Sequence, residues 1–351
     1  MMRRPSRWLL GLLLVVTLLL VIPVVLLLVL VDPVSRAAHL PQRVDVSPLS
    51  RYITVPFVGT DGITLHYLDA GSDTDGSGEA LPVFLLLHGF TFNAFTWQAQ
   101  MQQLARHGRV IALDQLPYGL SDKPVPGEWD RASPYSREAA VMLVRSLLDQ
   151  LELRRVIIVG NSSGGTLGAE VALAEPERVD GLVLVAPWVF VTRPVLPDWL
   201  VDTAPLRRIS LLAARELGLR MPLLESSFAE PARMPVGRRE LAGLHTQTRN
   251  WDLAWAALLD QSLRTRIDLA ERIGDLVQPV LVLSGDHDRL VPVDDSRRLA
   301  VDLPNADFHL MIGCGHVAHE ECPAAFSVAV DDWLNRKALL NDEAAVPGGT
   351  H

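Results

Sequence analysis

The sequence predicts an α/β fold with a mostly parallel central sheet and helices on both faces. Short apolar runs typical of buried strands alternate with segments of helical periodicity over most of the chain. Such alternation is typical of parallel sheets whose strands are joined by crossover helices. A second observation is the segment GNSSG at 160–164, which directly follows the apolar run 156–159 and precedes a helical pattern. Together they predict a sheet with a functional turn at the end of one strand.

The predicted elements follow in order along the chain. An opening hairpin is expected at 51–69, because Asp61-Gly62 supplies a turn between two strand-like runs. Helices are expected at 137–151 and 165–174, where apolar residues recur at helical spacing. The remaining strands are expected at 83–87, 110–114, 156–159, 182–185, 280–283 and 308–312.

The GNSSG segment has the G-x-S-x-G spacing of a nucleophile elbow. In such a turn the serine backbone is strained and its hydroxyl is held at the carboxyl end of the sheet. The glycines stand where a side chain would collide with the neighbouring strand or helix. The spacing selects Ser162, rather than Ser163, as the nucleophile.

A serine nucleophile needs a base, and the base needs an acid that orients it. After an elbow of this kind the acid and then the histidine follow, each after a later strand. The apolar run 280–283 leads into SGDHD at 284–288, and the run 308–312 leads into GCGH at 313–316. A carboxylate and an imidazole therefore stand where a catalytic triad requires them.

Several ordered segments resemble the α/β-hydrolase fold family. LLHGF at 86–90 resembles the oxyanion loop of that family, and DQLPYGLSDKP at 114–124 resembles its strand-4 turn. GDHDRLVP at 285–292 resembles its acid loop, and GHVAHEECP at 315–323 its histidine loop. The resemblance runs from about residue 52 to residue 334. Pro117 is a departure, because the family usually has glycine there.

The resemblance implies roles for the residues of these loops. Spacing from the start of the acid loop favours Asp288 as the acid, with Asp286 as the alternative, and His316 as the base. Backbone N–H groups of Ser163 and Phe90 are expected to form the oxyanion hole, which stabilises the charge of a tetrahedral intermediate. Three other histidines are expected to be structural: His66, His88 and His319.

The N-terminal part of the chain contains a long uncharged apolar segment. Residues 8–31 make 31 − 8 + 1 = 24 residues, and a helix of that length is about 36 Å long, enough for a ~30 Å hydrocarbon core. A retained transmembrane anchor is therefore expected. The alternative is a cleaved signal peptide with a processing site at Ser35-Arg36-Ala37, although signal peptides usually have shorter apolar regions.

Charge around this segment gives a weak indication of its orientation. Arg3, Arg4 and Arg7 precede it, whereas Arg36 and Arg43 follow it. Under the positive-inside rule this small bias favours a cytoplasmic N-terminus and a catalytic domain on the extracytoplasmic side.

The predicted organisation has one globular domain behind the anchor. A tail at 1–7, the transmembrane helix at 8–31 and a linker at 32–50 precede the core, which comprises 51–187 and 268–338. The intervening segment 188–267 has no strand periodicity and is expected to form a helical cap. Residues 339–351 are expected to be a disordered tail. The cap contains apolar residues that are expected either to pack it on the core or to line an apolar substrate entrance: Trp188, Phe190, Trp199, Met221, Phe228, Trp251 and Trp255.

Composition excludes several classes of partner and cofactor. The net charge of −9 disfavours nucleic acid. The histidines lack metal-ligand spacing and no phosphate-binding loop or dinucleotide fingerprint is present, so neither a metal nor a cofactor is expected. Cys314 and Cys322 flank the histidine loop and are expected to be two buried thiols rather than a disulfide.

These observations predict a membrane-anchored serine hydrolase that cleaves a small-molecule or lipid-like ester through an acyl-enzyme intermediate. Epoxide hydrolases and haloalkane dehalogenases are disfavoured, because they resemble this family but have aspartate where Ser162 stands. A C–C bond hydrolase and a cofactor-free haloperoxidase remain alternatives on the same triad. From another class, a non-catalytic binding module on a membrane tether also remains open.

Overall fold

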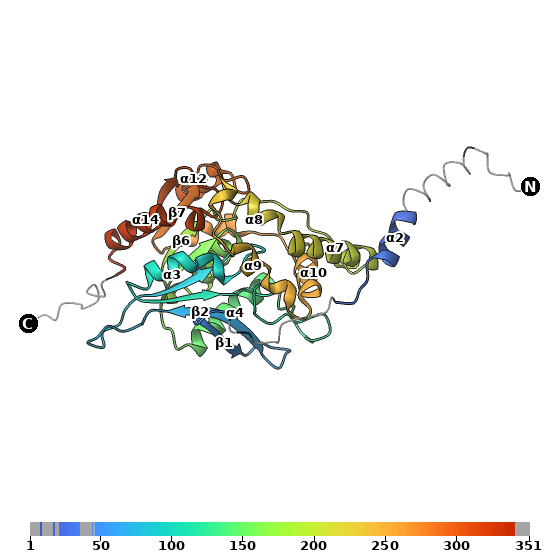
Figure 1. Cartoon of the computed structure of the whole chain (residues 1–351), viewed down its shortest axis with the longest axis horizontal. Helices are drawn as coiled ribbons and strands as arrows, with labels where there is room; N and C mark the ends of the chain where they lie inside the picture. The colour runs from blue at the N-terminus through green and yellow to red at the C-terminus, as the bar shows by residue number, and fades with distance from the viewer. Residues whose placement is uncertain (1–7, 9–16, 18–20, 36–43, 45, 341–351) are drawn as a thin grey trace, which may run out of the picture.

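The computed structural model describes residues 8, 17, 21–35, 44 and 46–340. Its centre is an eight-stranded sheet in the order β1-β2-β4-β3-β5-β6-β7-β8 (Figure 1). The strands are β1 Ser50–Val55, β2 Ile63–Ala70, β3 Val83–Leu87, β4 Arg109–Leu113, β5 Val156–Asn161, β6 Val179–Val185, β7 Val280–Gly285 and β8 Ala306–Met311.

The sheet is parallel apart from its first two strands. β1 and β2 form the predicted hairpin, in which Thr54 pairs with Thr64, and β2 runs antiparallel to β4. Gly62 in the hairpin turn has φ +104°, a conformation that favours glycine. All remaining neighbours, from β4 through β3 to β8, pair in parallel. The predicted α/β class is therefore confirmed.

Helices cover both faces of the sheet, as predicted. The apolar side chains of β3 point to both faces of the sheet and enter two separate buried clusters. Val83, Leu85 and Leu87 belong to the first cluster, and Phe84 and Leu86 belong to the second. A strand buried on both faces needs a helical layer on each. The first cluster includes residues of α4 (Arg137–Gln150), α5 (Ser163–Ala174) and α12 (Val293–Asp302). The second includes residues of α3 (Gln98–Leu104) and α14 (Pro323–Arg336).

The segment between β6 and β7 forms a helical layer of its own. Its helices are α6 Asp198–Val201, α7 Ala204–Arg220, α8 Pro222–Ser226, α9 Arg238–Ala242 and α10 Trp251–Ser262. Figure 1 shows α7 and α10 on the side where α2 approaches the globular part, with α8 and α9 nearer the middle of the view. Short α11 Leu269–Arg272 then leads back to β7, and α13 Ala318–Glu321 precedes α14.

The N-terminal apolar segment is described only in part. α2 spans Ile22–Leu30, and it lies against α7 of the cap. Within the described residues, every helix is too short or too polar to span a bilayer. Part of the anchor predicted at 8–31, namely 9–16 and 18–20, lies outside the described residues, as do residues 341–351 of the tail predicted at 339–351.

Candidate active site

Ser162 occupies a strained turn between β5 and α5. Its backbone has φ 53° and ψ −120°, in a region that non-glycine residues rarely adopt and that costs on the order of 1–3 kcal/mol. A Cβ on Gly160 would lie 2.6 Å from the Cα of Gly165, and one on Gly164 would overlap the carbonyl of Leu87. The turn is therefore as tight as the predicted elbow requires.

The predicted oxyanion loop lies directly beside this serine. A Cβ on Gly89 would be 3.3 Å from the Cβ of Ser162, so only glycine allows this approach without displacement. Phe90 follows Gly89, and Phe90 and Ser163 line the same cavity. Ser163 is the first residue of α5, where N–H groups have no acceptor within the helix. The two predicted oxyanion donors thus belong to residues that meet at one cavity.

The acid and the histidine form a buried pair. His316 Nδ1 lies 2.8 Å from Asp288 Oδ2, and both side chains are almost fully buried. The other oxygen, Asp288 Oδ1, accepts hydrogen bonds from the backbone N–H groups of Leu290 at 2.8 Å and Val291 at 2.9 Å. These bonds fix the carboxylate, which can then hold the imidazole in one orientation.

Asp286 has different partners. Its Oδ1 contacts His287 Nδ1 at 2.7 Å and accepts a hydrogen bond from Gly313 N–H at 2.7 Å. It therefore joins the ends of β7 and β8, whereas His316 pairs with Asp288. Between the two candidate acids, the geometry favours Asp288.

Asn161 connects the elbow to the histidine loop. Its Nδ2 donates to the backbone carbonyl of His316 and to that of Val185, both at 3.1 Å. Because Asn161 immediately precedes Ser162, these bonds position the histidine loop relative to Ser162. Sequence reasoning gave Asn161 no role; its place inside the GNSSG segment was the available signal.

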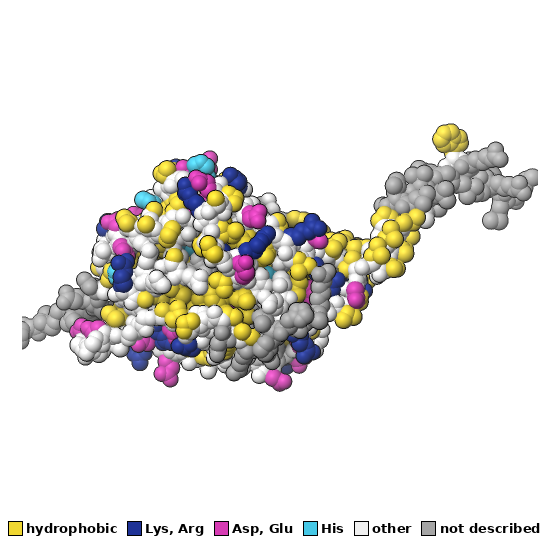
Figure 2. All heavy atoms as spheres, in the orientation of Figure 1, with side chains coloured by type: hydrophobic (Ala, Val, Ile, Leu, Met, Phe, Trp, Pro, Cys, Tyr) yellow, Lys and Arg dark blue, Asp and Glu magenta, His cyan; other side chains and the backbone are white. Residues whose placement is uncertain are grey.

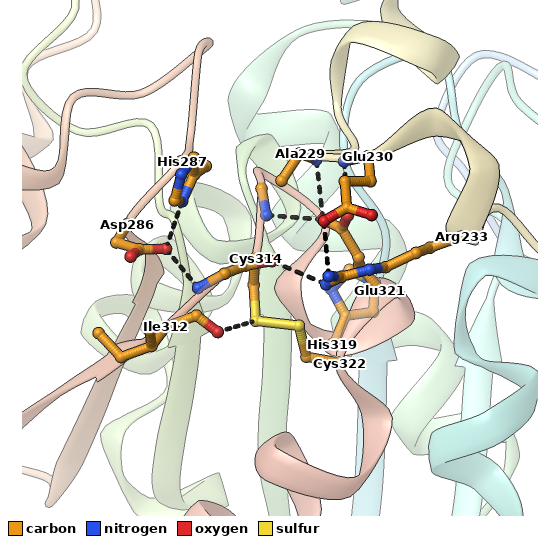
Figure 3. The surroundings of a disulfide bond; sticks show 12 residues. Ala229, Glu230, Arg233, Asp286, His287, Ile312, Cys314, His319, Glu321 and Cys322 are labelled. Atoms are coloured by element: carbon orange, nitrogen blue, oxygen red, sulfur yellow. Dashed lines mark hydrogen bonds and ion pairs between the residues drawn. A yellow bond between two sulfur atoms is a disulfide. The ribbon is translucent and has the colours of Figure 1, made fainter.

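A disulfide joins Cys314 and Cys322, so the expectation of two free thiols was wrong. α13 turns the chain back on itself, and the two Cα atoms lie 6.2 Å apart, within the range that a disulfide bridges. Figure 3 shows this bond beside the turn that leads from Cys314 toward α13. The closed loop contains His316, so the disulfide restrains the histidine that the sequence predicts as the base.

Glu321 holds the same loop to the cap. Its Oε2 accepts from Gly315 N–H at 2.7 Å and Ala229 N–H at 2.9 Å, and its Oε1 accepts from Glu230 N–H at 2.9 Å (Figure 3). Hydrogen bonds of this kind stabilise a buried carboxylate. Sequence analysis named Glu321 only as part of the histidine-loop resemblance and did not foresee this role.

Replacing both cysteines by serine is expected to lower stability and activity together. Chain entropy predicts a loss of about 2–3 kcal/mol in the free energy of unfolding for a loop of this size, and the loop that carries His316 becomes less restrained. Urea unfolding and ester turnover would measure the two effects. A reducing agent should reproduce the loss in the wild type and leave the double variant unchanged; equal sensitivity of both proteins would contradict the prediction.

His88 braces the oxyanion loop, as predicted. Its Nδ1 is 2.8 Å from the carbonyl of Gly89, and its Nε2 lies 3.1 Å from the backbone N–H of Gln115. Nε2 must accept there, so the ring is held neutral. Burial lowers the pKa of His88 to about 4, against the opposing effect of Asp114.

Two other buried histidines are affected in the same way. Burial lowers the pKa of His245 in the cap to about 3. It lowers the pKa of His319, which lies against the Trp97 ring, well below its usual range.

These buried histidines predict instability in acid. A histidine whose pKa is lowered on folding binds more protons when unfolded, so its contribution to stability is complete above about pH 6.5 and is lost toward pH 4. Each is expected to change the free energy of unfolding by about 1.4 kcal/mol per pH unit in that range. Urea titrations across the range would measure the slope. His245→Gln should reduce this slope by the contribution of one histidine, whereas His309→Gln, a change at an exposed position, should leave the slope unchanged. Equal slopes in the wild type and both variants would contradict the role assigned to His245.

A second Ser-His-Asp arrangement lies elsewhere in the core. His66 Nδ1 is 2.7 Å from Asp114 Oδ2, and His66 Nε2 is 3.0 Å from Ser50 Oγ. All three side chains are buried. Asp114 also accepts hydrogen bonds from the backbone N–H groups of Ala94 and Leu120. Burial by itself raises the pKa of Asp114, but the attraction and the hydrogen bond of His66 outweigh burial, and the pKa is lowered to about 2. The arrangement therefore joins β2 to the turn after β4, consistent with the structural role expected of His66.

A cavity of about 420 Å³ is lined by Phe90 and Ser163 together with residues of the core and of the cap. Ser163, Thr166, Leu167 and Glu170 line it from one face of α5, at helical spacing. Trp188 of the cap lines it as well. Trp251, Trp255 and Phe228 are instead buried in the packing of the cap, while Trp199 is exposed. The described residues contain no group of three or more side chains suited to a metal ion.

The site can be compared with known proteins. A sequence profile of the alpha/beta hydrolase fold family matches residues 82–323, a range that includes every predicted site residue. The chain belongs to the alpha/beta hydrolase fold family. This hydrolase is 30% identical over 303 residues to a 2-hydroxy-6-oxononadienedioate/2-hydroxy-6-oxononatrienedioate hydrolase from Paraburkholderia xenovorans, which covers 83% of this chain and 98% of that one.

Solved structures share the fold at lower identity. A thermophilic esterase from Thermogutta terrifontis is 23% identical with a TM-score of 0.63, covering 82% of this hydrolase and 99% of the esterase. A membrane phospholipase A is 24% identical with a TM-score of 0.63 and covers 95% of this hydrolase and 99% of its own chain.

Proposed function

We propose that this hydrolase is a membrane-anchored serine esterase that cleaves carboxylic esters with an apolar acyl or alkyl group. The observation that carries the proposal is the mostly apolar cavity that starts at Phe90 and Ser163, beside the strained Ser162. In the proposed reaction His316 removes the proton from Ser162 Oγ, which attacks the ester carbonyl. Asp288 orients His316 and stabilises its protonated form.

The second half of the reaction uses the same groups. The N–H groups of Ser163 and Phe90 stabilise the oxyanion, and His316 returns its proton to the departing alcohol. The acyl group stays on Ser162 Oγ until His316 activates a water molecule, which attacks the acyl carbonyl and releases the acid. Each step thus requires only residues of this chain and water.

The cavity walls favour an uncharged chain. The face of α5 that lines the cavity extends from Ser163 to Glu170, which at about 1.5 Å per residue is about 10 Å. This length leaves room for about eight bonds of an extended chain. Arg137 is already paired with Glu170 at 3.1 Å and with Asp268 at 2.7 Å. Leu113, Leu143 and Val144 are among the apolar residues along the cavity.

C–C bond hydrolysis is the second candidate, and the named activity of the Paraburkholderia relative favours it. A dioate substrate carries two carboxylates, each of which needs a cation or several hydrogen-bond donors when buried. Among the described residues that line the cavity, Arg193 is the arginine without a carboxylate partner. A single free cation fits a dianionic substrate poorly, so we favour ester hydrolysis over C–C bond hydrolysis.

A substrate panel separates these candidates and the binding module. We expect p-nitrophenyl esters to be hydrolysed, with kcat/KM rising as the acyl chain lengthens to about eight bonds and levelling beyond that length. A 2-hydroxy-6-oxo-dienoate should react with lower kcat/KM than the best ester. The reverse order would replace the esterase by the C–C hydrolase, and absence of turnover together with absence of fluorophosphonate labelling would leave the binding module.

We also propose that residues 8–31 anchor the enzyme, with the catalytic domain on the extracytoplasmic side. The apolar length and the arginine bias of the sequence support this topology. The Cys314–Cys322 disulfide adds support, because disulfides persist in oxidising compartments. The coverage of 95% of this chain by a membrane phospholipase A is consistent with a lipid-like ester as substrate.

Fractionation tests the anchor separately from the chemistry. The full-length enzyme should stay with membranes in high salt and carbonate, while a form that begins near Arg43 should be soluble and active on a short ester. Protease added to intact spheroplasts should digest the catalytic domain. Protection would reverse the topology, and a mature N-terminus near Ala38 would replace the anchor by a cleaved signal peptide.

A further inference from the structure

We propose that the face of the cap formed by α6 and α7 lies on the phospholipid bilayer and that the substrate cavity opens next to it. This inference rests on the proposed anchor. It assigns the exposed side of α6 and α7 to the lipid surface and predicts that ester substrates reach Ser162 directly from the membrane.

A buried ion pair clamps the chain after α2 to the cap. Arg215 of α7 pairs with Asp252 of α10 at 2.9 Å, and its remaining nitrogens donate to the carbonyls of Asp32 and Val34, both at 2.9 Å. Ser35 Oγ donates to the other oxygen of Asp252 at 2.7 Å. Three of these hydrogen bonds therefore fix the segment that follows the apolar helix to α7 and α10, and the ion pair joins those two helices.

Apolar packing continues this attachment into α2. Leu27 and Val31 pack with Leu211 and Ala214 of α7, in a cluster that also contains Phe90. The predicted span that precedes Leu27, residues 8–26, still has 26 − 8 + 1 = 19 residues. As a helix it would be about 28 Å long, close to the ~30 Å of a hydrocarbon core. The bilayer surface would then lie about level with α7.

α7 presents apolar side chains to solvent on its outer face. Ile209, Leu212 and Leu219 are exposed, whereas Leu211 and Ala214 of the same helix are buried. On neighbouring α6, Trp199 is 73% exposed. Tryptophan and exposed leucine are typical of protein surfaces that lie in the membrane interface. Figure 2 shows the hydrophobic side chains of α2 leading down to this end of the molecule.

The cavity reaches the surface beside α6. Among the described residues that line it, Thr265 is the one that is exposed, which places the mouth there. The rim is tied to the segment before α6, because Arg193 Nη2 donates to the Thr265 carbonyl at 3.2 Å and Leu196 N–H donates to the Leu263 carbonyl at 2.8 Å. Arg264 pairs with Asp198 of α6 at 2.8 Å. Trp199 is the next residue along the chain.

The charge of this region suits a lipid surface. Between Arg193 and Arg220 the sequence has five arginines and three acidic residues, a balance of 5 − 3 = +2, although the whole protein has −9. Arg193 Nε is buried without a hydrogen-bond partner, and burial followed by repulsion from Arg137 lowers the pKa of Arg193. A guanidinium at the mouth that has no carboxylate partner among the described residues can bind the phosphate of a lipid headgroup.

Fluorescence quenching tests the contact. Full-length protein would be reconstituted into phosphatidylcholine–phosphatidylglycerol vesicles that contain brominated phospholipid. Trp199→Phe should remove part of the lipid-quenched emission, whereas Trp129→Phe, a matched change on the core, should not. If both variants are quenched like the wild type, Trp199 does not touch the bilayer and the proposal is overturned.

Activity on two substrates tests the consequence. Leu212→Asp should lower the rate on a vesicle-borne ester by about tenfold, the effect of losing one buried leucine from the contact, with the rate on a short soluble ester unchanged. Val301→Asp, the same kind of change at an exposed position of α12, should affect neither rate. Thermal unfolding would show that both variants fold.

The same samples distinguish the possible failures. Absence of fluorophosphonate labelling and of short-ester turnover would refute the proposed function, and loss of wild-type flotation with vesicles would refute the anchor. Equal vesicle activity of Leu212→Asp and Val301→Asp, with both of those intact, would refute only the membrane-facing surface. A wild-type dimer that Leu212→Asp dissociates would assign this face to a second copy instead.

Discussion

Ser162→Ala is expected to abolish both fluorophosphonate labelling and ester turnover. In the proposed mechanism the hydroxyl oxygen of Ser162 forms the bond to the acyl group, so its removal leaves the reaction without a nucleophile. Loss of a catalytic serine reduces kcat on the order of 10⁶-fold in other triad enzymes. Mass spectrometry of labelled protein and single-turnover kinetics would measure the effect.

Two other serines provide matched controls. Ser163→Ala should keep most of the labelling, because Ser163 acts through its backbone N–H. Ser50→Ala should also keep labelling, although Ser50 belongs to the second, buried Ser-His-Asp arrangement, and should instead lower stability through the lost contact with His66. Labelling of Ser162→Ala at the wild-type rate, with the adduct on Ser50, would show that the wrong triad had been chosen.

Asp288→Asn is expected to cost about 10³–10⁴ in kcat while changing stability much less than activity. The amide keeps the shape of the carboxylate but no longer stabilises a protonated His316 or fixes its tautomer. The 2.8 Å contact between His316 Nδ1 and Asp288 Oδ2 is the interaction that this change removes. Steady-state kinetics on a short ester would measure it.

Asp286→Asn is the matched change on the competing acid. It should cost far less kcat, because Asp286 contacts His287 and Gly313 rather than the catalytic histidine. Equal losses in the two variants, or a larger loss for Asp286→Asn, would reverse the assignment of the acid.

The sequence predicted the features that depend on residues close together in the chain, namely the buried strands and the elbow. Apolar runs of four or five residues became most of β3, β4, β5 and β7, because strands buried on both faces need unbroken apolar sequence. The elbow was predictable because glycine spacing reports directly on how closely backbones approach. Relative placement of the loops after β3, β5, β7 and β8 followed from their common position at the carboxyl end of a parallel sheet.

The parts that sequence missed depend on contacts between distant segments. Whether Cys314 and Cys322 can bond depends on how α13 turns the chain, which their spacing alone does not report. Spacing already favoured Asp288 over Asp286, but it did not indicate that the N–H groups of Leu290 and Val291 would fix the carboxylate, because these bonds depend on loop conformation. Glu321 acquires its role only because residues 229–230 of the cap fold onto the histidine loop.

The seating of α2 on the cap was also beyond sequence reasoning. The apolar segment predicted an anchor, yet nothing in its composition indicated that Arg215 and Asp252 would hold its C-terminal end. This contact places α2 in the same apolar cluster as Phe90 of the oxyanion loop. The proposed membrane anchor would thus be connected to the active-site region through α7 and α10.

Trapping the acyl-enzyme tests the central claim most directly. Rapid mixing with a p-nitrophenyl ester, followed by acid quench and peptide mass spectrometry, should show one acyl group per enzyme on the peptide that contains Ser162, formed at the rate of the initial burst of p-nitrophenolate. In Asp288→Asn the same adduct should form more slowly. Turnover with the acyl group on any other residue, or with no acyl-enzyme at any time, would contradict the assignment of Ser162 as nucleophile.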